Sequence, residues 1–198
     1  VLLGRKKELS EIIEVLCCRN KNNPLLIGDA GVGKTAIVEE LSRIIESGNV
    51  PRRLQNKKIY SVAMSSLVAG TKYRGEFEEK ISKLIREVEE DDDIILFIDE
   101  IHTLVGAGGA DGAIDASNIL KPSLARGKIK IIGATTKEEY DKYILNDKAL
   151  SRRFRIIKVE EPNIDNTREI LMGIKGIYEN FHNVVINDNI IDLVLEYS

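Results

Sequence analysis

The sequence has no tryptophan, few residues that bind transition metals and no long apolar run. Its two cysteines, Cys17 and Cys18, are adjacent, and neighbouring residues rarely form a disulfide, so we expect free thiols in a reducing compartment. Their spacing to His102 and His182 matches no familiar metal site, which excludes a metal centre built from these side chains. No apolar stretch approaches the roughly 20 residues that span a bilayer, and no signal-peptide pattern is present. We therefore expect a soluble protein of the cytoplasm or an organelle matrix, with no membrane contact.

Composition and charge are those of an ordinary folded domain. The 198 residues are 43% hydrophobic and 31% charged, which suffices for one domain with a full core and part of a second. The formal net charge is -3, so the chain as a whole has no electrostatic attraction to nucleic acid. We expect no nucleic-acid partner.

Short apolar segments alternate along the chain with segments of helical spacing. The predicted strands cover residues 24–27, 59–63, 94–98, 130–134 and 156–159. The predicted helices cover about 6–18, 34–47, 77–88 and the residues around 118–120. Pro122 is expected to kink or restart the last of these helices. This alternation predicts an α/β fold, with a parallel sheet flanked by helices.

A domain boundary is predicted at Glu160-Glu161-Pro162-Asn163. Only helical patterns follow it, from 164 to about 178 and from 187 to 197. Two helices bury little apolar surface by themselves, so we interpret residues 162–198 as the beginning of a small helical domain. Residues 1–161 then form the large α/β domain.

The most informative motif is G-x-x-x-x-G-K-[ST], which the chain matches as Gly28-Asp29-Ala30-Gly31-Val32-Gly33-Lys34-Thr35. A predicted strand precedes it and a predicted helix follows, as a phosphate-binding loop requires. Backbone N–H groups and the helix N-terminus can then bind a polyphosphate, because glycine has no Cβ to hold the phosphate away. Lys34 reaches the β- and γ-phosphates, and the Thr35 hydroxyl binds Mg²⁺. The alternative is a glycine-rich turn that binds nothing.

Two carboxylates follow the apolar strand 94–98. Ligands of open α/β sheets bind at the carboxyl ends of the strands, so Asp99 and Glu100 should face the phosphate loop. Phosphoryl transfer needs a carboxylate for Mg²⁺ and a group that orients the attacking water. Asp99 suits the first role and Glu100 the second. Taken alone, such a pair could equally be a solvated strand end.

Two further segments carry groups that an ATPase could use. Gly133-Ala134-Thr135-Thr136 ends the next strand, where a hydroxyl could contact the γ-phosphate or the attacking water. The alternative for these threonines is a plain N-cap of the helix that begins at 137. Arg152 and Arg153 follow a short charged helix and could neutralise charge on a transferred phosphoryl group. The alternative for the arginines is a solvated charged face.

Together these residues resemble the AAA+ ATPases, and most specifically the first ATPase module of the Clp-type unfoldases and disaggregases, the ClpA/ClpB/ClpC group. The resemblance extends over nearly the whole chain. The segments that carry it are Leu3-Gly4-Arg5, 21–24, the phosphate loop, 72–78, 97–102, 118–122, 133–136 and 152–154.

The resemblance implies ATP or ADP with Mg²⁺ as cofactors and assigns a role to each candidate residue. Lys34 and Thr35 are the Walker A pair, and Asp99 and Glu100 are the Walker B pair. The remaining assignments are Thr136 as sensor 1, Arg152 and Arg153 as arginine fingers acting on a neighbouring subunit's ATP, and the backbone of Leu3, Gly4 and Arg5 as part of the adenine pocket.

Tyr73 matches the pore-loop tyrosine that grips unfolded polypeptide in this family. Its neighbours Lys72 and Arg74 make a core position improbable, and a flat amphipathic ring can hold extended chain with little sequence preference. The alternative is an ordinary exposed loop tyrosine.

The resemblance further implies a homo-hexamer, unfolded or aggregated polypeptide substrates and, for some members, a Clp-type peptidase partner. It leaves open whether the parent protein feeds a peptidase or acts alone. Details of the amino-acid sequence favour the ClpC subgroup and a bacterial or plastid-type setting.

Two other functions remain open from the sequence. One is a nucleic-acid-associated AAA+ ATPase of the clamp-loader or helicase-loader type, which would need a basic surface that follows a strand. The net acidity of the chain argues against it. The other is a nucleotide-binding switch that binds ATP without hydrolysing it.

Overall fold

A five-stranded parallel sheet lies at the centre of the protein. The computed structural model describes residues 4–63, 74–105 and 117–197. The strands are β1 (Asn23–Ile27), β2 (Lys58–Val62), β3 (Ile94–Ile98), β4 (Lys130–Thr135) and β5 (Phe154–Lys158). They lie in the order β2-β3-β4-β1-β5, and every neighbouring pair is parallel. The predicted α/β fold with a parallel sheet is confirmed.

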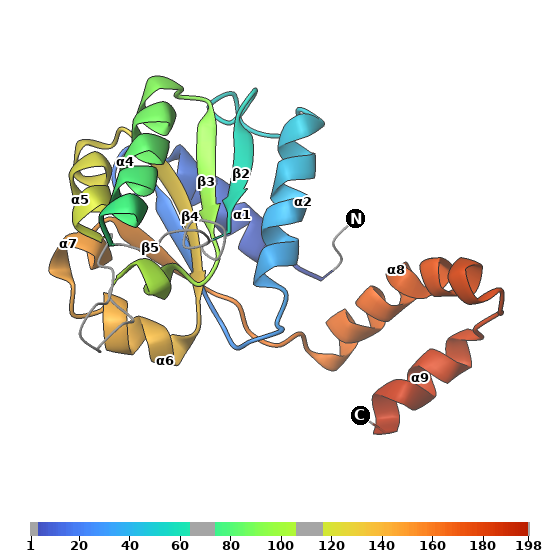
Figure 1. The fold of residues 1–198 in the computed structure, drawn as a ribbon. Coiled ribbons are helices and arrows are strands. Elements are labelled where there is room, and N and C mark those ends of the chain that lie inside the picture. The colour runs from blue at the N-terminus through green and yellow to red at the C-terminus, as the bar shows by residue number, and fades with distance from the viewer. Residues whose placement is uncertain (1–3, 64–73, 106–116, 198) are drawn as a thin grey trace.

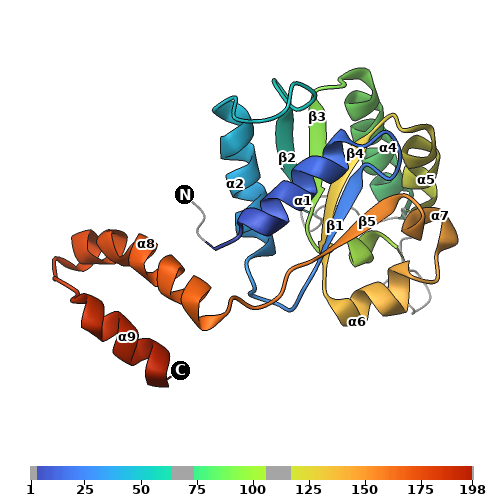
Figure 2. The same cartoon turned by 180° about the vertical axis from the view of Figure 1, so that it is seen from behind.

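Helices cover both faces of this sheet (Figures 1 and 2). They are α1 (Lys6–Cys17) and α2 (Lys34–Glu46) on one face, and α4 (Arg74–Glu90) and α5 (Ser117–Arg126) on the other. Successive strand residues point to opposite faces: Leu26 and Ile95 join the core under α1 and α2, whereas Leu25 and Leu96 join the core under α4 and α5. Full burial of such a side chain contributes about 1.5–3 kcal/mol. The sheet is therefore held by two apolar layers.

The predicted elements agree with the structure within a few residues at most ends, with two informative differences. Strand β5 begins at Phe154, two residues before the predicted start. Phe154 is buried in the core, and the exposed Arg155 beside it hid this from the apolar pattern used to predict the strand. Helix α5 continues through Pro122 as one element, so the expected restart does not occur. An interior proline removes one backbone donor and crowds the carbonyl four residues earlier, and the burial of Leu120 and Leu124 on either side of it opposes that cost here.

Four short elements shape the edges of the sheet. They are the 3₁₀ turn η1 (Ile101–Leu104), α6 (Lys137–Glu139), the π-helical turn η2 (Tyr140–Ile144) and α7 (Lys148–Ser151). Helix α7 begins where the Asp147 carboxylate accepts hydrogen bonds from the backbone N–H groups of Ala149 and Leu150. This cap fixes the turn that leads into Arg152.

Helices α8 (Ile164–His182) and α9 (Asp188–Tyr197) form a hairpin outside the α/β body (Figure 1). The Asn163 side chain caps α8 by accepting a hydrogen bond from the Asn166 N–H. Apolar side chains remain exposed on this hairpin, with Phe181 83% and Val185 84% accessible. The division into residues 1–161 and 162–198 stays a prediction. None of the helices in the described ranges combines the length and apolar content needed to cross a membrane.

Candidate nucleotide-binding and hydrolysis site

The carboxyl edge of the sheet gathers three of the predicted segments. The phosphate loop follows β1, Asp99 and Glu100 follow β3, and Thr135 and Thr136 end β4. Since β1 lies beside β4 and β4 beside β3, these segments come together at one edge. They enclose a cavity of about 610 Å³ that is lined by Ala30, Gly31, Gly33, Lys34, Thr35, Ala36, Glu39, Asp99, Glu100, Thr135, Thr136 and Glu139.

The backbone of the phosphate loop requires its glycines. Gly31 and Gly33 have φ values of +83° and +95°, which side chains rarely tolerate, and a Cβ at either would project into open space. Gly33 is also the N-cap residue of α2, whose first residues line the cavity. A helix N-terminus with open space before it suits a phosphate group.

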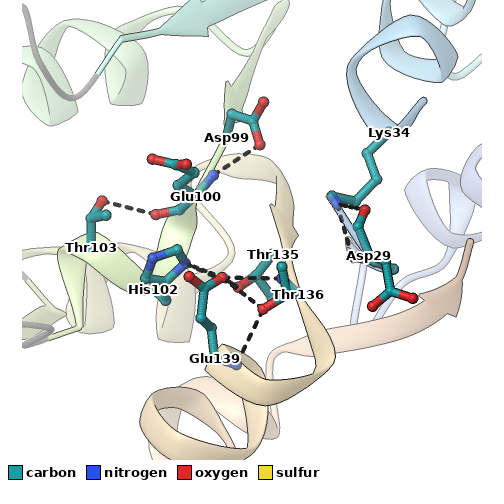
Figure 3. A network of polar contacts seen from close by, with 10 residues as sticks. Asp29, Lys34, Asp99, Glu100, His102, Thr103, Thr135, Thr136 and Glu139 are labelled. Carbon is teal, nitrogen blue, oxygen red and sulfur yellow. Dashed lines mark hydrogen bonds and ion pairs between the residues drawn. The ribbon is translucent and has the colours of Figure 1, made fainter. Parts of the chain in front are cut away.

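Lys34 bridges the two ends of this loop. Its Nζ donates hydrogen bonds of 2.8 Å to the Gly28 carbonyl and 2.7 Å to the Asp29 carbonyl (Figure 3). An ammonium group has three protons, so one donor remains for a further acceptor. The lysine thus lies in the loop and lines the cavity, as the motif predicts.

Thr35 and Asp99 bring two oxygen ligands together. The Thr35 hydroxyl donates a 2.9 Å hydrogen bond to Asp99 Oδ2, and Asp99 Oδ1 accepts one of 2.9 Å from the Glu100 N–H. Magnesium is usually held by one or two carboxylates together with substrate phosphates and water, so this oxygen pair fits the ion. Within the described ranges, no group of three or more histidine, cysteine, aspartate or glutamate side chains could hold a metal by itself.

Glu100 is held in an uncommon backbone conformation. Its φ of 50° and ψ of 44° lie in the left-handed region, which costs a residue with a side chain about 1–3 kcal/mol. The Glu100 carbonyl accepts hydrogen bonds from both the N–H and the hydroxyl of Thr103, each 2.8 Å long. These bonds lock η1 directly after β3, and Glu100 lines the cavity beside Asp99.

Thr136 lies at the cavity and is also a helix cap. Its hydroxyl donates a 2.8 Å hydrogen bond to Glu139 Oε2 and accepts one of 3.3 Å from the Glu139 N–H. The same carboxylate accepts from the Thr136 N–H, which completes a capping box at the start of α6. The cap that we considered as an alternative therefore exists, and it occupies a residue that also faces the candidate site.

The sequence did not reveal that Thr135 and His102 belong to the same network (Figure 3). The buried Thr135 hydroxyl donates a 3.2 Å hydrogen bond to Glu139 Oε2 and lies 3.0 Å from His102 Nδ1. His102 Nδ1 lies 3.1 Å from the same Glu139 oxygen. The network joins the turn after β3 to the end of β4, so it links the segments of Glu100 and Thr136. The spacing Thr136-x-x-Glu139 is a capping-box pattern and was the available signal.

Glu139 is best described as an ionised carboxylate. Burial opposes its ionisation, but the hydrogen bonds from the Thr136 side chain and backbone, together with His102 and Thr135, outweigh burial and lower the pKa of Glu139. An ionised carboxylate only accepts hydrogen bonds, so the nearby His102 Nδ1 is assigned the proton.

Arg152 and Arg153 lie away from this cavity. They line a separate cavity of about 550 Å³ with Lys121, Pro122, Ala125, Lys148 and Ala149. Asp147 positions the segment, because it caps α7 and forms a 2.7 Å ion pair with Lys121. Among the described residues, the cavity lined by the two arginines shares no lining residue with the phosphate-loop cavity. This chain therefore does not bring its own arginines to its own phosphate loop.

The N-terminal segment contacts the phosphate loop through Arg5. This side chain is 5% exposed, and its guanidinium donates hydrogen bonds to the Val32 carbonyl (2.8 Å), the Glu160 carbonyl (2.7 Å) and the Glu8 carboxylate (2.8 Å). Gly4, with a φ of +72°, lies against Asn166 at the start of α8. The adenine-pocket assignment of this backbone stays a prediction. Leu3 and Tyr73 lie outside the described residues.

Comparison with known proteins assigns a family to this architecture. The profile of the ATPase family associated with various cellular activities (AAA) matches residues 24–161. The chain is 55% identical over 197 residues to the chaperone protein ClpB of Aquifex aeolicus, and covers 20% of that protein. It is 54% identical over 197 residues to the ATP-dependent Clp protease ATP-binding subunit ClpC of Staphylococcus epidermidis, and covers 24% of it. Both alignments cover 100% of this chain.

A solved structure agrees with this comparison. The S. cerevisiae Hsp104-ADP complex superimposes with a TM-score of 0.86 at 46% identity, covering 96% of this chain and 32% of that chain. The chain thus spans about a fifth to a third of the length of the proteins that it matches.

Proposed function

This chain belongs to the AAA family of ATPases and matches Clp-type chaperones along its whole length. From that premise we propose that it is the ATP-driven module of a protein unfoldase or disaggregase. The observation that carries the proposal is the meeting of Lys34, Thr35, Asp99 and Glu100 around one cavity at the carboxyl edge of the sheet. A phosphate cradle, two oxygen ligands for a cation and a further carboxylate are the groups that phosphoryl transfer to water requires.

We assign nucleotide binding to residues 28–35. The loop backbone and the N-terminus of α2 hold the phosphates, and Lys34 turns a donor toward the β- and γ-phosphates. Thr35 and Asp99 would hold Mg²⁺, which supplies charge neutralisation on the phosphate oxygens when it is bound. Gly4 and Arg5, with Leu3, are assigned to the adenine side.

We assign hydrolysis to Glu100 and Thr136. The Glu100 carboxylate accepts a hydrogen bond from the attacking water and orients it, and the fixed turn after β3 keeps the carboxylate at the cavity. The Thr136 hydroxyl contacts the γ-phosphate or that water. Both roles depend on placement rather than on strong bases, as phosphoryl transfer allows.

Arg152 and Arg153 are proposed to act on the nucleotide of a neighbouring subunit. Their separate cavity supports this, because a group that serves its own site should line that site. A ring of identical subunits, a homo-hexamer in the full-length protein, would supply one subunit's arginines to the next subunit's phosphates.

The substrate is proposed to be unfolded or aggregated polypeptide, gripped by Tyr73 in a central pore. One matched relative is named a chaperone and another a subunit of a protease, so partnership with a Clp-type peptidase is part of the proposal. The large and small domains are proposed to meet at residue 161. The alternative of a nucleic-acid-associated ATPase gains no support from these similarities.

The proposed site is tested by titrating the chain with a fluorescent ADP analogue in the presence of Mg²⁺. Lys34→Ala should lower the affinity by tenfold or more, which is about 1.4 kcal/mol, because it removes the cation on the phosphates. Lys83→Ala, on the exposed surface of α4, is the matched control and should bind as the wild type does. Undiminished binding by Lys34→Ala would refute the assignment of the phosphate loop.

A further inference from the structure

One oxygen of Glu139 accepts more hydrogen bonds than a carboxylate oxygen can satisfy well. Four donors lie around Oε2: the Thr136 hydroxyl at 2.8 Å, His102 Nδ1 at 3.1 Å, the Thr135 hydroxyl at 3.2 Å and the Thr136 N–H at 3.3 Å. A carboxylate has about four lone-pair sites over its two oxygens. The donors at Oε2 therefore compete, and the loss of one of them leaves the oxygen satisfied.

Of these four donors, the Thr136 hydroxyl is the one that the proposed function also assigns to the γ-phosphate. It has one proton, which it donates to Glu139 through the shortest of the four contacts. A γ-phosphate oxygen can receive that proton only if the bond to Glu139 is released. Glu139 and Thr136 both line the cavity, so the Glu139 carboxylate and a bound γ-phosphate would be alternative acceptors for the same hydroxyl.

The remaining contacts keep the free-energy cost of releasing the Thr136 hydroxyl from Glu139 small. When the hydroxyl turns away, Glu139 keeps the Thr136 N–H, the Thr135 hydroxyl and His102. The Thr136 oxygen can still accept from the Glu139 N–H, so the start of α6 stays capped. The cost is then confined to one charge-assisted hydrogen bond.

We propose that Glu139 is a positioning residue of the nucleotide site, which holds the Thr136 hydroxyl in competition with the γ-phosphate and thereby sets the preference of the chain for ATP over ADP. The proposal rests on the function proposed above, in which Thr136 contacts the γ-phosphate. His102 and Thr135 supply the donors that take over at Glu139 when the hydroxyl leaves it.

Two simpler roles for Glu139 make different predictions. A carboxylate that only caps α6 would affect stability and leave nucleotide preference unchanged. A carboxylate that only repels phosphate through its charge would weaken ATP and ADP binding whether or not Thr136 has a hydroxyl. Competition for a hydroxyl requires that hydroxyl, so its effect must vanish when Thr136 is replaced.

The first experiment compares dissociation constants for Mg-ADP and for the Mg complex of a slowly hydrolysed ATP analogue. Glu139→Gln keeps a capping side chain and removes the charged acceptor. The ratio of the ADP constant to the analogue constant should rise about three- to tenfold, because a neutral amide holds the hydroxyl less strongly. Glu138→Gln, which makes the same charge change on the same short helix, should leave the ratio unchanged. An unchanged ratio in a folded Glu139→Gln would overturn the proposal.

The second experiment repeats the measurement in a Thr136→Val background. The Glu139→Gln effect on the ratio should disappear there, and should return in Thr136→Ser, which restores a hydroxyl. Persistence of the effect in Thr136→Val would show that charge alone acts, and would end the proposal. Failure of the proposed function looks different: Thr136→Val by itself would then bind both nucleotides with the wild-type ratio. Circular dichroism and thermal unfolding confirm that each variant is folded.

Discussion

Replacing Gly28 by alanine should separate the phosphate loop from the sheet. An ideal Cβ at Gly28 would lie 2.1 Å from the carbonyl oxygen of Val159, just after β5. Ordinary contact begins at 3.4 Å, so the backbones must move apart by 3.4 Å minus 2.1 Å, or about 1.3 Å. No rotation of a side chain can relieve this overlap, because the obstructing atom belongs to the main chain.

The cost follows from the bonds on either side of that glycine. The Val159 N–H donates a 2.8 Å hydrogen bond to the Ile27 carbonyl, and the Gly28 N–H donates one of 3.3 Å to the Thr135 carbonyl. A shift of this size weakens or breaks both, at about 1 kcal/mol each, and overpacking adds about 1–3 kcal/mol. We expect Gly28→Ala to lower the free energy of unfolding by about 3–5 kcal/mol and to weaken ADP binding at least tenfold.

Urea denaturation followed by circular dichroism measures the first quantity and fluorescent-nucleotide titration the second. Gly176→Ala is the control, since Gly176 lies inside α8, where an added Cβ meets nothing within 4 Å apart from its chain neighbours and the backbone of its own helix. It should raise the free energy of unfolding by up to about 1 kcal/mol. A Gly28→Ala protein within about 0.5 kcal/mol of the wild type, with intact ADP binding, would refute the close approach of loop and strand.

Three further predictions concern the site and its neighbour. Glu100→Gln should keep Mg-ATP affinity and lower turnover at this module by about a hundredfold or more, measured in the full-length assembly with any other ATPase module silenced. Arg152→Ala should leave the ADP affinity of the single chain unchanged and reduce ATP hydrolysis in the ring. Rings that mix Arg152→Ala subunits with Glu100→Gln subunits should recover some hydrolysis. If confirmed mixed rings recover none, the arginine does not act between subunits. Burial raises the pKa of Asp147, but the hydrogen bond and charge of Lys121 and the α7 N–H groups lower it overall, so its stabilisation is present at neutral pH and lost as pH falls below about 4. Asp147→Asn should therefore cost about 1 kcal/mol at pH 7 and progressively less as the pH falls below about 4, by urea denaturation at each pH.

Much of the fold could be predicted because each element carries a local signal. The strand 94–98 is apolar throughout, and the phosphate loop has a motif whose glycines and lysine each have a physical function. The order of the strands could not be read from these patterns, since it depends on which strands pair over long sequence distances. The early start of β5 at Phe154 shows the same limit at a smaller scale, because charged neighbours conceal a buried aromatic residue.

The individual residues of the candidate site were predicted from the sequence, but the contacts between its segments were not. Motifs named Lys34, Thr35, Asp99 and Glu100, and these four do line one cavity. His102 was considered only as a metal ligand, because nothing in the sequence places it against the end of β4. Its contact with Glu139 depends on η1 and α6 meeting at the sheet edge, which is a tertiary event.

The buried Arg5 has a mechanical consequence. It is the first buried side chain in the described part of the chain, and its guanidinium holds both the phosphate loop at Val32 and the exit of β5 at Glu160. Tension applied at the N-terminal end would thus load the wall of the phosphate loop before it could shear any strand from the sheet. We expect the lifetime of bound nucleotide to shorten under a pulling force too weak to unfold the α/β body. Arg5, directly before α1, would in that way transmit force to the bound nucleotide.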